Sequence, residues 1–223
     1  MLSDRFLALI TAALLMLLLG WDLSGLDLPL AQRFGDASGF ALRESWWLTK
    51  VMHEGARAVS WLLLLALLAG IWRPWGGLVR LPRRRRVQLV AGALAAALLV
   101  SLLKGASATS CPWDLAEFGG PAQHLTHWLG FLRSDGGPGH CFPAGHASSG
   151  FVFLAGYFAF RADAPMLARR WLIGALAAGL LLGWAQQVRG AHFMSHTLWT
   201  GLLCWLMVWA VDGLWRHSSG DIA

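Results

Sequence analysis

The feature that most constrains this chain is a series of long apolar runs that recurs along its length. They lie at roughly 5–21, 57–72, 87–104, 143–160, 171–187 and 192–214. A helix needs about 20 apolar residues to cross a bilayer, and each run is close to that length. Only 13% of the 223 residues are charged, too few to cover a soluble protein of this size. The runs predict an all-α integral membrane protein, a bundle of six transmembrane helices.

The runs leave no room between them for a separate soluble module. We therefore expect a single domain over residues 1–223, with its core at roughly 50–215. The first run resembles a signal peptide, but no small-residue cleavage site follows it cleanly, so we interpret it as a helix. Residues 46–54 mix apolar side chains with Lys50 and Glu54. This mixture predicts a short interfacial helix at the lipid headgroups.

Arginines mark one side of the predicted bundle. They concentrate in the second-to-third connection, in the fourth-to-fifth connection and in the C-terminal tail: Arg73, Arg80, Arg83, Arg84, Arg85, Arg86, Arg161, Arg169, Arg170 and Arg216. Cytoplasmic loops carry an excess of Lys and Arg, so these loops are expected in the cytoplasm. Six crossings then place both termini there. The net charge of +6 follows from this topology and does not indicate nucleic-acid binding.

Two cysteines share one predicted outer loop. Cys111 and Cys141 lie between the third and fourth runs, whereas Cys204 lies within the last run. An oxidising compartment would permit a Cys111–Cys141 disulfide, worth about 3–4 kcal/mol in the chain-entropy model. The alternative is two free thiols. A metal site is not expected, because the sequence has no Cys-x-x-Cys spacing.

Residues suited to binding a phosphate gather at the outer ends of the runs. Lys104 ends the third run, Gly145 and His146 begin the fourth, and Arg189 precedes the sixth. A phosphate site needs cations, helix N-terminal N–H groups, a nucleophile and a proton donor. Pro143, which suits a first helical turn, and Gly145, which permits close approach, would open the fourth helix toward the phosphate.

Histidines supply the candidate nucleophile. His192 and His196 are four residues apart, which predicts that they share one face of the last helix, one attacking while the other orients its ring. Asp114 either orients a catalytic histidine or caps a turn. The remaining histidines of the outer side are interpreted as interfacial hydrogen-bonding residues: His53, His124, His127 and His140.

These residues carry a resemblance. The chain resembles the type 2 phosphatidic acid phosphatase superfamily, whose motifs run Lys-x6-Arg-Pro, Pro-Ser-Gly-His and Ser-Arg-x5-His-x3-Asp. Here they appear as Lys104 with Cys111-Pro112, as Pro143-Ala144-Gly145-His146, and as Gly190-Ala191-His192-Phe193-Met194-Ser195-His196. Four positions depart from the pattern: Cys111 replaces arginine, Ala144 replaces serine, His196 replaces aspartate, and Gln186 stands where the motif arginine is expected. Arg189 lies one helical turn later.

The resemblance implies roles for these residues. His192 would be the nucleophile that forms a phosphohistidine, His146 the general acid, and Lys104 with Arg189 the phosphate clamp, without a metal or cofactor. A second register makes His196 the nucleophile. Ala144, Gly145 and Asp114 complete the expected substrate-binding set.

The expected function is a metal-independent phosphatase or phosphotransferase of a bacterial inner membrane, with its site at the periplasmic face. The substrates that the resemblance implies are lipid phosphates or diphosphates: lipid A, undecaprenyl diphosphate, phosphatidylglycerophosphate and phosphatidic acid. The alternative is a catalytically silent lipid-phosphate-binding or scaffold protein of the same fold, which the departures at Cys111, Ala144 and His196 favour.

Overall fold

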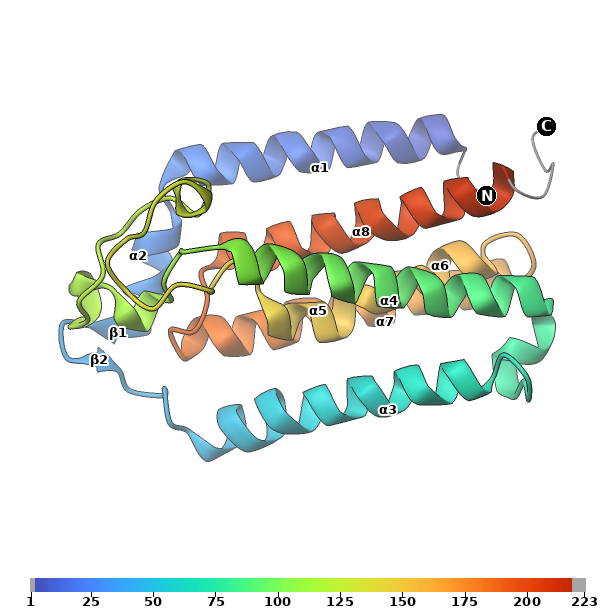
Figure 1. Ribbon diagram of the computed structural model, residues 1–223, viewed down its shortest axis with the longest axis horizontal. Helices are drawn as coiled ribbons and strands as arrows, with labels where there is room; N and C mark the ends of the chain where they lie inside the picture. Colours follow the sequence, from blue (N-terminus) through green and yellow to red (C-terminus); the bar gives the residue numbers. More distant parts are fainter. Residues whose placement is uncertain (1–2, 218–223) are drawn as a thin grey trace.

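The structure is a computed structural model that describes residues 3–217, and it is a helical bundle (Figure 1). Five helical segments are long and apolar enough to cross a membrane: α1 (Asp4–Ser24), Trp47–Ala69, α4 (Arg83–Ala106), α7 (Pro165–Val188) and α8 (Met194–His217). They correspond to five of the six predicted spans. The length and composition of these helices indicate a membrane protein.

Local signals in the sequence fix several helix ends. The Ser3 hydroxyl accepts a hydrogen bond from the Phe6 amide at the start of α1, and Gly25 ends that helix with φ of 66°. Both are common devices, because a hydroxyl satisfies an unpaired N–H and glycine tolerates a left-handed conformation. Pro165 occupies the first turn of α7, where its missing N–H costs nothing.

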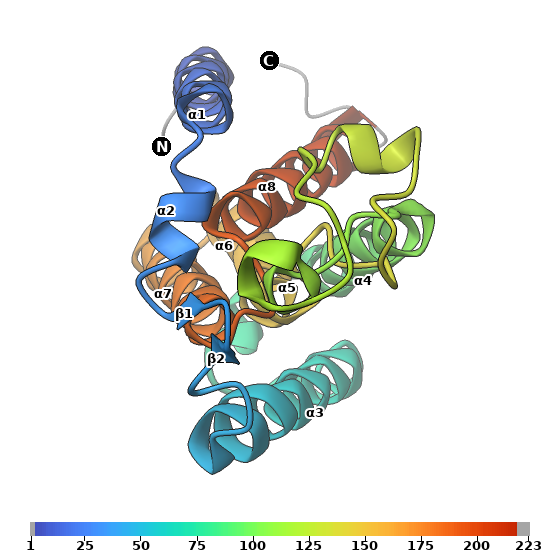
Figure 2. The ribbon, with the colours of Figure 1, turned by 90° about the vertical axis from the view of Figure 1, so that its left-hand side faces the viewer.

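The remaining predicted span, the fourth at 143–160, forms a shorter helix in the interior of the bundle. It consists of α5 (Gly145–Phe151), the 3-10 turn η6 (Val152–Leu154) and α6 (Ala155–Phe160), which follow one another without a break. Every residue from Phe151 to Phe160 is buried. In the end-on view α5 lies between α4, α7 and α8 (Figure 2). This central helix is therefore covered by protein.

Close packing of the central helix against α7 depends on two glycines. A Cβ at Gly150 would lie 2.3 Å from the backbone nitrogen of Gly179, and a Cβ at Gly179 would lie 2.4 Å from the Phe151 ring. Both distances are far below van der Waals contact. The two backbones can approach this closely only because neither position carries a side chain.

Helices α1 and α3 (Ala56–Ala69) lie on opposite sides of the central helices in both views (Figures 1 and 2). α1 buries only Leu7, Thr11 and Leu18, and α3 only Leu64 and Leu67. The predicted helix near residues 46–54 is present as the π-helix η1 (Trp47–Gly55), but it runs directly into α3. It is thus an extension of that helix and not a separate segment.

The arginine-rich loops gather at one end of the bundle. Asp212 is fully buried there and accepts a hydrogen bond from Arg161 at 2.6 Å. Asp4, at the start of α1, contacts Arg161 at 3.3 Å and Arg216 at 2.6 Å. These contacts join the beginning of the first helix to the end of the last, so both described ends of the chain lie at the arginine-rich end.

The opposite end is covered by the outer loops. The shorter elements of the chain are α2 (Asp27–Ala31), the two-stranded ribbon of β1 (Gly35–Asp36) and β2 (Gly39–Phe40), and the 3-10 turns η2 (Gly76–Arg80), η3 (Pro112–Asp114), η4 (Ala116–Phe118) and η5 (Leu129–Phe131). All except η2 belong to this end. Within the long loop, Asp135 accepts hydrogen bonds from the amide and hydroxyl of Ser110, at 2.6 and 2.7 Å.

Candidate functional site

A cavity of about 280 Å³ lies at the outer end of the bundle between α3, α4 and α5. Its polar wall contains Arg57, Lys104, Gly145, His146 and Ser148. The Lys104 side chain lies over Gly145, because a Cβ at that position would be 3.6 Å from the lysine Cδ. Two of the predicted site residues from different helices thus meet on one cavity wall.

His53 contacts His146 but does not itself line this cavity. The two imidazole rings are stacked, with centroids 3.5 Å apart and an interplanar angle of 21°. His53 lies on the π-helical segment η1, and π-helical turns often occur at functional sites. The interpretation of His53 as an interfacial residue is therefore incomplete, and no local sequence signal connects it with His146 across more than ninety residues.

His192 lies in the turn between α7 and α8, before the first residue of α8. The prediction that it shares a helical face with His196 is therefore wrong in detail. Its Nδ1 lies 3.5 Å from the Cys141 sulfur, and the charges of Lys104 and His146 are near enough to act on it. Complete burial holds the pKa of His192 well below its ordinary value of 6.5, so the ring is neutral.

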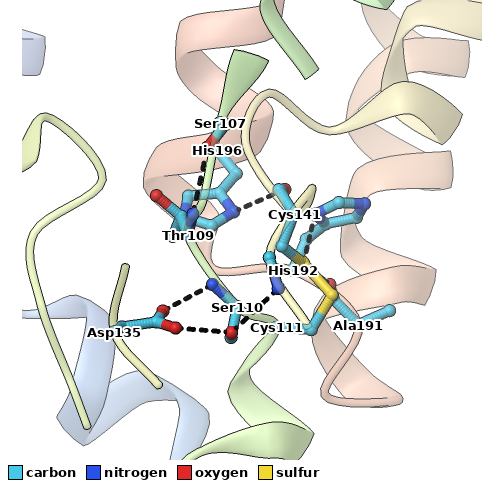
Figure 3. The surroundings of a disulfide bond; sticks show 10 residues. Ser107, Thr109, Ser110, Cys111, Asp135, Cys141, Ala191, His192 and His196 are labelled. Carbon is cyan, nitrogen blue, oxygen red and sulfur yellow. Dashed lines mark hydrogen bonds between the residues drawn. A yellow bond between two sulfur atoms is a disulfide. The ribbon is translucent and has the colours of Figure 1, made fainter. Parts of the chain in front are cut away.

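Cys141 holds both histidines of the last motif (Figure 3). The predicted Cys111–Cys141 disulfide is present, and the carbonyl of Cys141 lies 3.1 Å from Nδ1 of His196. The rings of His192 and His196 are 5.8 Å apart at 64°, with no hydrogen bond between them in the described part of the chain. His192 and His196 therefore do not orient each other as their spacing predicted. Each of them contacts Cys141 instead.

His196 faces a different cavity from His146. This second cavity, of about 470 Å³, is lined by Asp22, Asp27, His127 and His196. Asp22 and His127 approach to 3.5 Å, and burial lowers the pKa of His127 against the opposing effect of Asp22. Lys104 does not line this cavity, although its charge is near enough to act on both His192 and His196.

Arg189 ends α7 and points toward the outer loops. Its Nε donates to the carbonyl of Arg43 at 2.9 Å, and its Nη1 donates to the Gln186 side chain at 3.1 Å. Its guanidinium lies 5.7 Å from the Trp113 ring centre. Gln186, at the position where the motif has arginine, thus accepts a hydrogen bond from Arg189 one turn later. Arg189 is also close enough to His146 to act on its charge.

The start of the central helix differs from the prediction in one respect. The helix begins at Gly145, so Pro143 precedes it and does not lie in its first turn. Ala144 is the N-cap residue, and its amide donates to the Thr200 hydroxyl at 2.9 Å. No side chain caps the helix. The first amides of the central helix therefore remain available beside Lys104.

Asp114 does not join the histidines. It ends η3, and its neighbours are Trp113 and Arg43 of the outer loops. Burial raises the pKa of its carboxyl above the ordinary value of 3.8. Its backbone carbonyl accepts a hydrogen bond from the Ala122 amide at 2.9 Å.

One group of potential metal ligands occurs in the described residues: Cys141, His192 and His196 place ligand atoms within 4.8 Å of one another. Zinc is bound by a cysteine thiolate. The sulfur of Cys141 is bonded to Cys111 and is not a thiolate. The residues as they stand are therefore a poor fit to a metal ion.

A comparison with protein families shows which family this chain belongs to. A family model described as PAP2 superfamily matches residues 86–216, which is more than half of the chain. The chain belongs to the PAP2 superfamily. PAP2 members are phosphatases, which places this chain among the phosphoric ester hydrolases and indicates lipid phosphates as the substrate class. The matched PAP2 region extends from α4 to α8 and contains Lys104, His146 and His192. Neither the comparison with curated proteins nor that with solved structures found a match.

Proposed function

We propose that this PAP2 protein hydrolyses the phosphate or diphosphate of a membrane lipid through a phosphohistidine on His192. The observation that carries the proposal is that Lys104 and His146 share a cavity wall, with His192 within electrostatic reach of both. A phosphate bound at this point would meet a cation and an acid, with the proposed nucleophile beyond the cavity wall. No metal enters the proposed reaction.

The orientation of His192 selects its reactive nitrogen. Because Nδ1 faces the Cys141 sulfur, Nε2 is the nitrogen that attacks phosphorus. A neutral ring that carries its proton on Nδ1 has a lone pair on Nε2, and the lowered pKa keeps the ring neutral. Attack forms the N–P bond while the P–O bond to the lipid breaks, and water later releases phosphate from the histidine.

His146 is proposed to protonate the departing lipid oxygen. Proton transfer to a leaving group is the role of a general acid, and the dianionic phosphate favours the protonated form of a neighbouring imidazole. Lys104 and Arg189 then stabilise the charge on the non-bridging oxygens. The free amides at the start of the central helix add to this stabilisation.

The location that we propose follows from the charge distribution. The arginine-rich end faces the cytoplasm of a bacterium, and the candidate site at the other end faces the periplasm. Both termini are then cytoplasmic, and the central helix completes a sixth crossing. A cavity rimmed by Trp61, Leu64 and Val100 suits a lipid whose tails stay in the bilayer. Lipid A, undecaprenyl diphosphate and phosphatidylglycerophosphate are the proposed candidates.

The test is phosphate release by the purified protein from a panel of these lipids in micelles. His192→Gln should abolish release, and wild type quenched with alkaline detergent should carry a phosphate that is labile to acid but stable to alkali. His196→Gln should retain a trappable phosphoenzyme. A phosphoenzyme that survives in His192→Gln and disappears in His196→Gln would overturn the assignment of the nucleophile.

The second candidate function is a catalytically silent protein that binds lipid phosphate. The observation that favours it is that His192 does not line the cavity that contains Lys104 and His146. The departures at Cys111, Ala144 and His196 point in the same direction. Lipid-phosphate binding without release of phosphate from any lipid of the panel would favour this function over hydrolysis.

A further inference from the structure

Arg57 is the only charged residue of α3, and it lies within a segment that is long and apolar enough to cross a membrane. Charged side chains in such segments are costly, and they often mark functional sites. The alternative is that the long side chain only extends to the lipid headgroups. The position and the partners of Arg57 distinguish the two interpretations.

The face of α3 that carries Arg57 forms one wall of the cavity that His146 lines. The residues of α3 in this wall are Arg57, Ser60, Trp61 and Leu64. They are spaced by three and four residues and so share one side of a helix. Arg57 is exposed, so a ligand in the cavity can reach its guanidinium. Its charge is near enough to act on His146.

No carboxylate neutralises Arg57. Its guanidinium makes no hydrogen bond and no ion pair with any described residue. Glu54, three residues earlier, forms an ion pair with Lys50 at 2.7 Å instead. The ammonium of Lys104 likewise has no such partner in residues 3–217, and the residues that line the cavity include no Asp or Glu. Two uncompensated cations thus border one small cavity, which favours a ligand with negative charge.

The motifs alone supply only one of these cations. Cys111 stands at the arginine position of the first motif, and its sulfur is part of the disulfide. Arg189 does not line the cavity, and its guanidinium is bonded to the outer loop and to α7. Lys104 is therefore the one motif cation in the cavity wall. Arg57 adds a second, from a helix outside the matched region 86–216.

We propose that Arg57 is a substrate-binding residue, whose guanidinium donates hydrogen bonds to the non-bridging oxygens of a lipid phosphate held beside Lys104. A guanidinium suits this role because its planar N–H groups match two phosphate oxygens at once. The inference rests on the proposed phosphate site but not on turnover, because it concerns binding. It makes α3, which buries only two of its residues, part of the headgroup site.

The test measures the binding of phosphatidic acid to the full chain in micelles by native mass spectrometry, in a His192→Gln background that should not consume the lipid. Arg57→Gln should weaken binding about tenfold to hundredfold, the effect of one charge-assisted hydrogen bond. Binding of diacylglycerol, which lacks the phosphate, should not change. Arg33→Gln is the matched control, because Arg33 is an exposed arginine of the outer loops that does not line the cavity.

A further variant separates the charge from the geometry of the guanidinium. Arg57→Lys keeps the charge but loses the paired N–H groups, so its affinity for phosphatidic acid should lie between those of the parent and of Arg57→Gln. The unfolding midpoint of Arg57→Gln should equal that of the parent, because no protein partner is lost. If Arg57→Gln does not fold, an Arg57→Lys affinity equal to that of the parent would overturn the proposal.

Competition by inorganic phosphate should weaken by the same factor in Arg57→Gln, because both ligands present the same oxygens. A change for inorganic phosphate alone would overturn the role in substrate binding. Equal effects of Arg57→Gln and Arg33→Gln on phosphatidic acid would overturn the site.

Kinetics in the wild-type background separate this inference from the proposed function. Hydrolysis of phosphatidic acid with a KM that Arg57→Gln leaves unchanged, together with unchanged binding, would overturn the inference and leave the function intact. Binding that depends on Arg57 without hydrolysis would support the inference and contradict the proposed turnover.

Discussion

His53 and His146 stack face to face with their ring centres 3.5 Å apart, although they come from helices far apart in the sequence. Ring contacts of this kind are worth about 0.5–1.5 kcal/mol. We therefore interpret His53 as a positioning residue for the proposed general acid. This relationship ties the π-helical start of the Trp47–Ala69 segment to the start of the central helix.

Replacing His53 tests the stack. His53→Ala should lower kcat about threefold to tenfold, the rate equivalent of one ring contact, with little change in KM. His53→Phe keeps an aromatic face and should recover most of that loss. Steady-state kinetics with a short-chain lipid phosphate measures both. A phenylalanine variant as impaired as the alanine variant would show that the imidazole, and not the stack, is required.

The proposed acid role of His146 predicts a dependence on the leaving group. His146→Gln should lower kcat for a lipid phosphate by about 100- to 10,000-fold, the usual contribution of a general acid. The loss should be much smaller for an activated aryl phosphate, whose leaving oxygen needs no proton. His217→Gln is the control, because His217 is exposed at the other end of the bundle. Equal losses for both substrates would contradict the acid role.

Removing the disulfide should affect both stability and turnover. The bridge spans 30 residues, and the paired Cys111→Ala and Cys141→Ala variant should lose about 3–4 kcal/mol of unfolding free energy. Its kcat should fall as well, because the sulfur and carbonyl of Cys141 contact the two histidines. Denaturant unfolding in micelles measures the first effect. Cys204→Ala, a buried free cysteine, should leave kcat unchanged.

The close approach of the central helix to α7 predicts a large effect from a single methyl group. Gly150→Ala would place a carbon 2.3 Å from the Gly179 backbone, and we expect a loss of about 1–3 kcal/mol. Gly174→Ala, also on α7, has open space around the new carbon and should be neutral or slightly stabilising. Comparable unfolding midpoints for the two variants would argue against this packing.

Stability should fall when the pH drops below about 6.5. Burial lowers the pKa of both His127 and His192 in the folded protein from that ordinary value. Between the lowered and the ordinary pKa the unfolded chain binds protons that the folded chain does not, so acid favours unfolding. His127→Phe keeps the ring stack on Phe142 but removes one titrating group. Its unfolding free energy should therefore depend less steeply on pH, and an unchanged slope would exclude His127 as a contributor.

Much of the bundle could be predicted because length and apolarity alone specify a spanning helix. The five long helices followed from such signals, whereas the disulfide was predicted from the position of two cysteines in one loop. The burial of the central helix could not be predicted, because an apolar run looks the same whether it faces lipid or protein. The close packing of Gly150 on Gly179, which covers this side of the central helix with α7, joins two separate segments of the chain.

The motifs predicted that Lys104 and His146 would lie together, and the two residues line one cavity. The exclusion of His192 from α8 could not be predicted, because a distant side chain sets the start of that helix. Asp27 accepts a hydrogen bond from the Ser195 amide at 3.0 Å, which caps α8 from another part of the chain. Gly190, with φ of 76°, turns the backbone just before. Neither effect is visible in residues 190–196 alone.

The position of Cys141 has a consequence for engineering the outer loop. Its amide donates to the Thr109 carbonyl, its sulfur is bonded to Cys111 and contacts His192, and its carbonyl contacts His196. A graft or insertion between residues 112 and 140 that displaces Cys141 should therefore shift the rings of both His192 and His196. Loop redesign in this protein is therefore expected to alter the rate of turnover even where the lipid's own contacts are untouched.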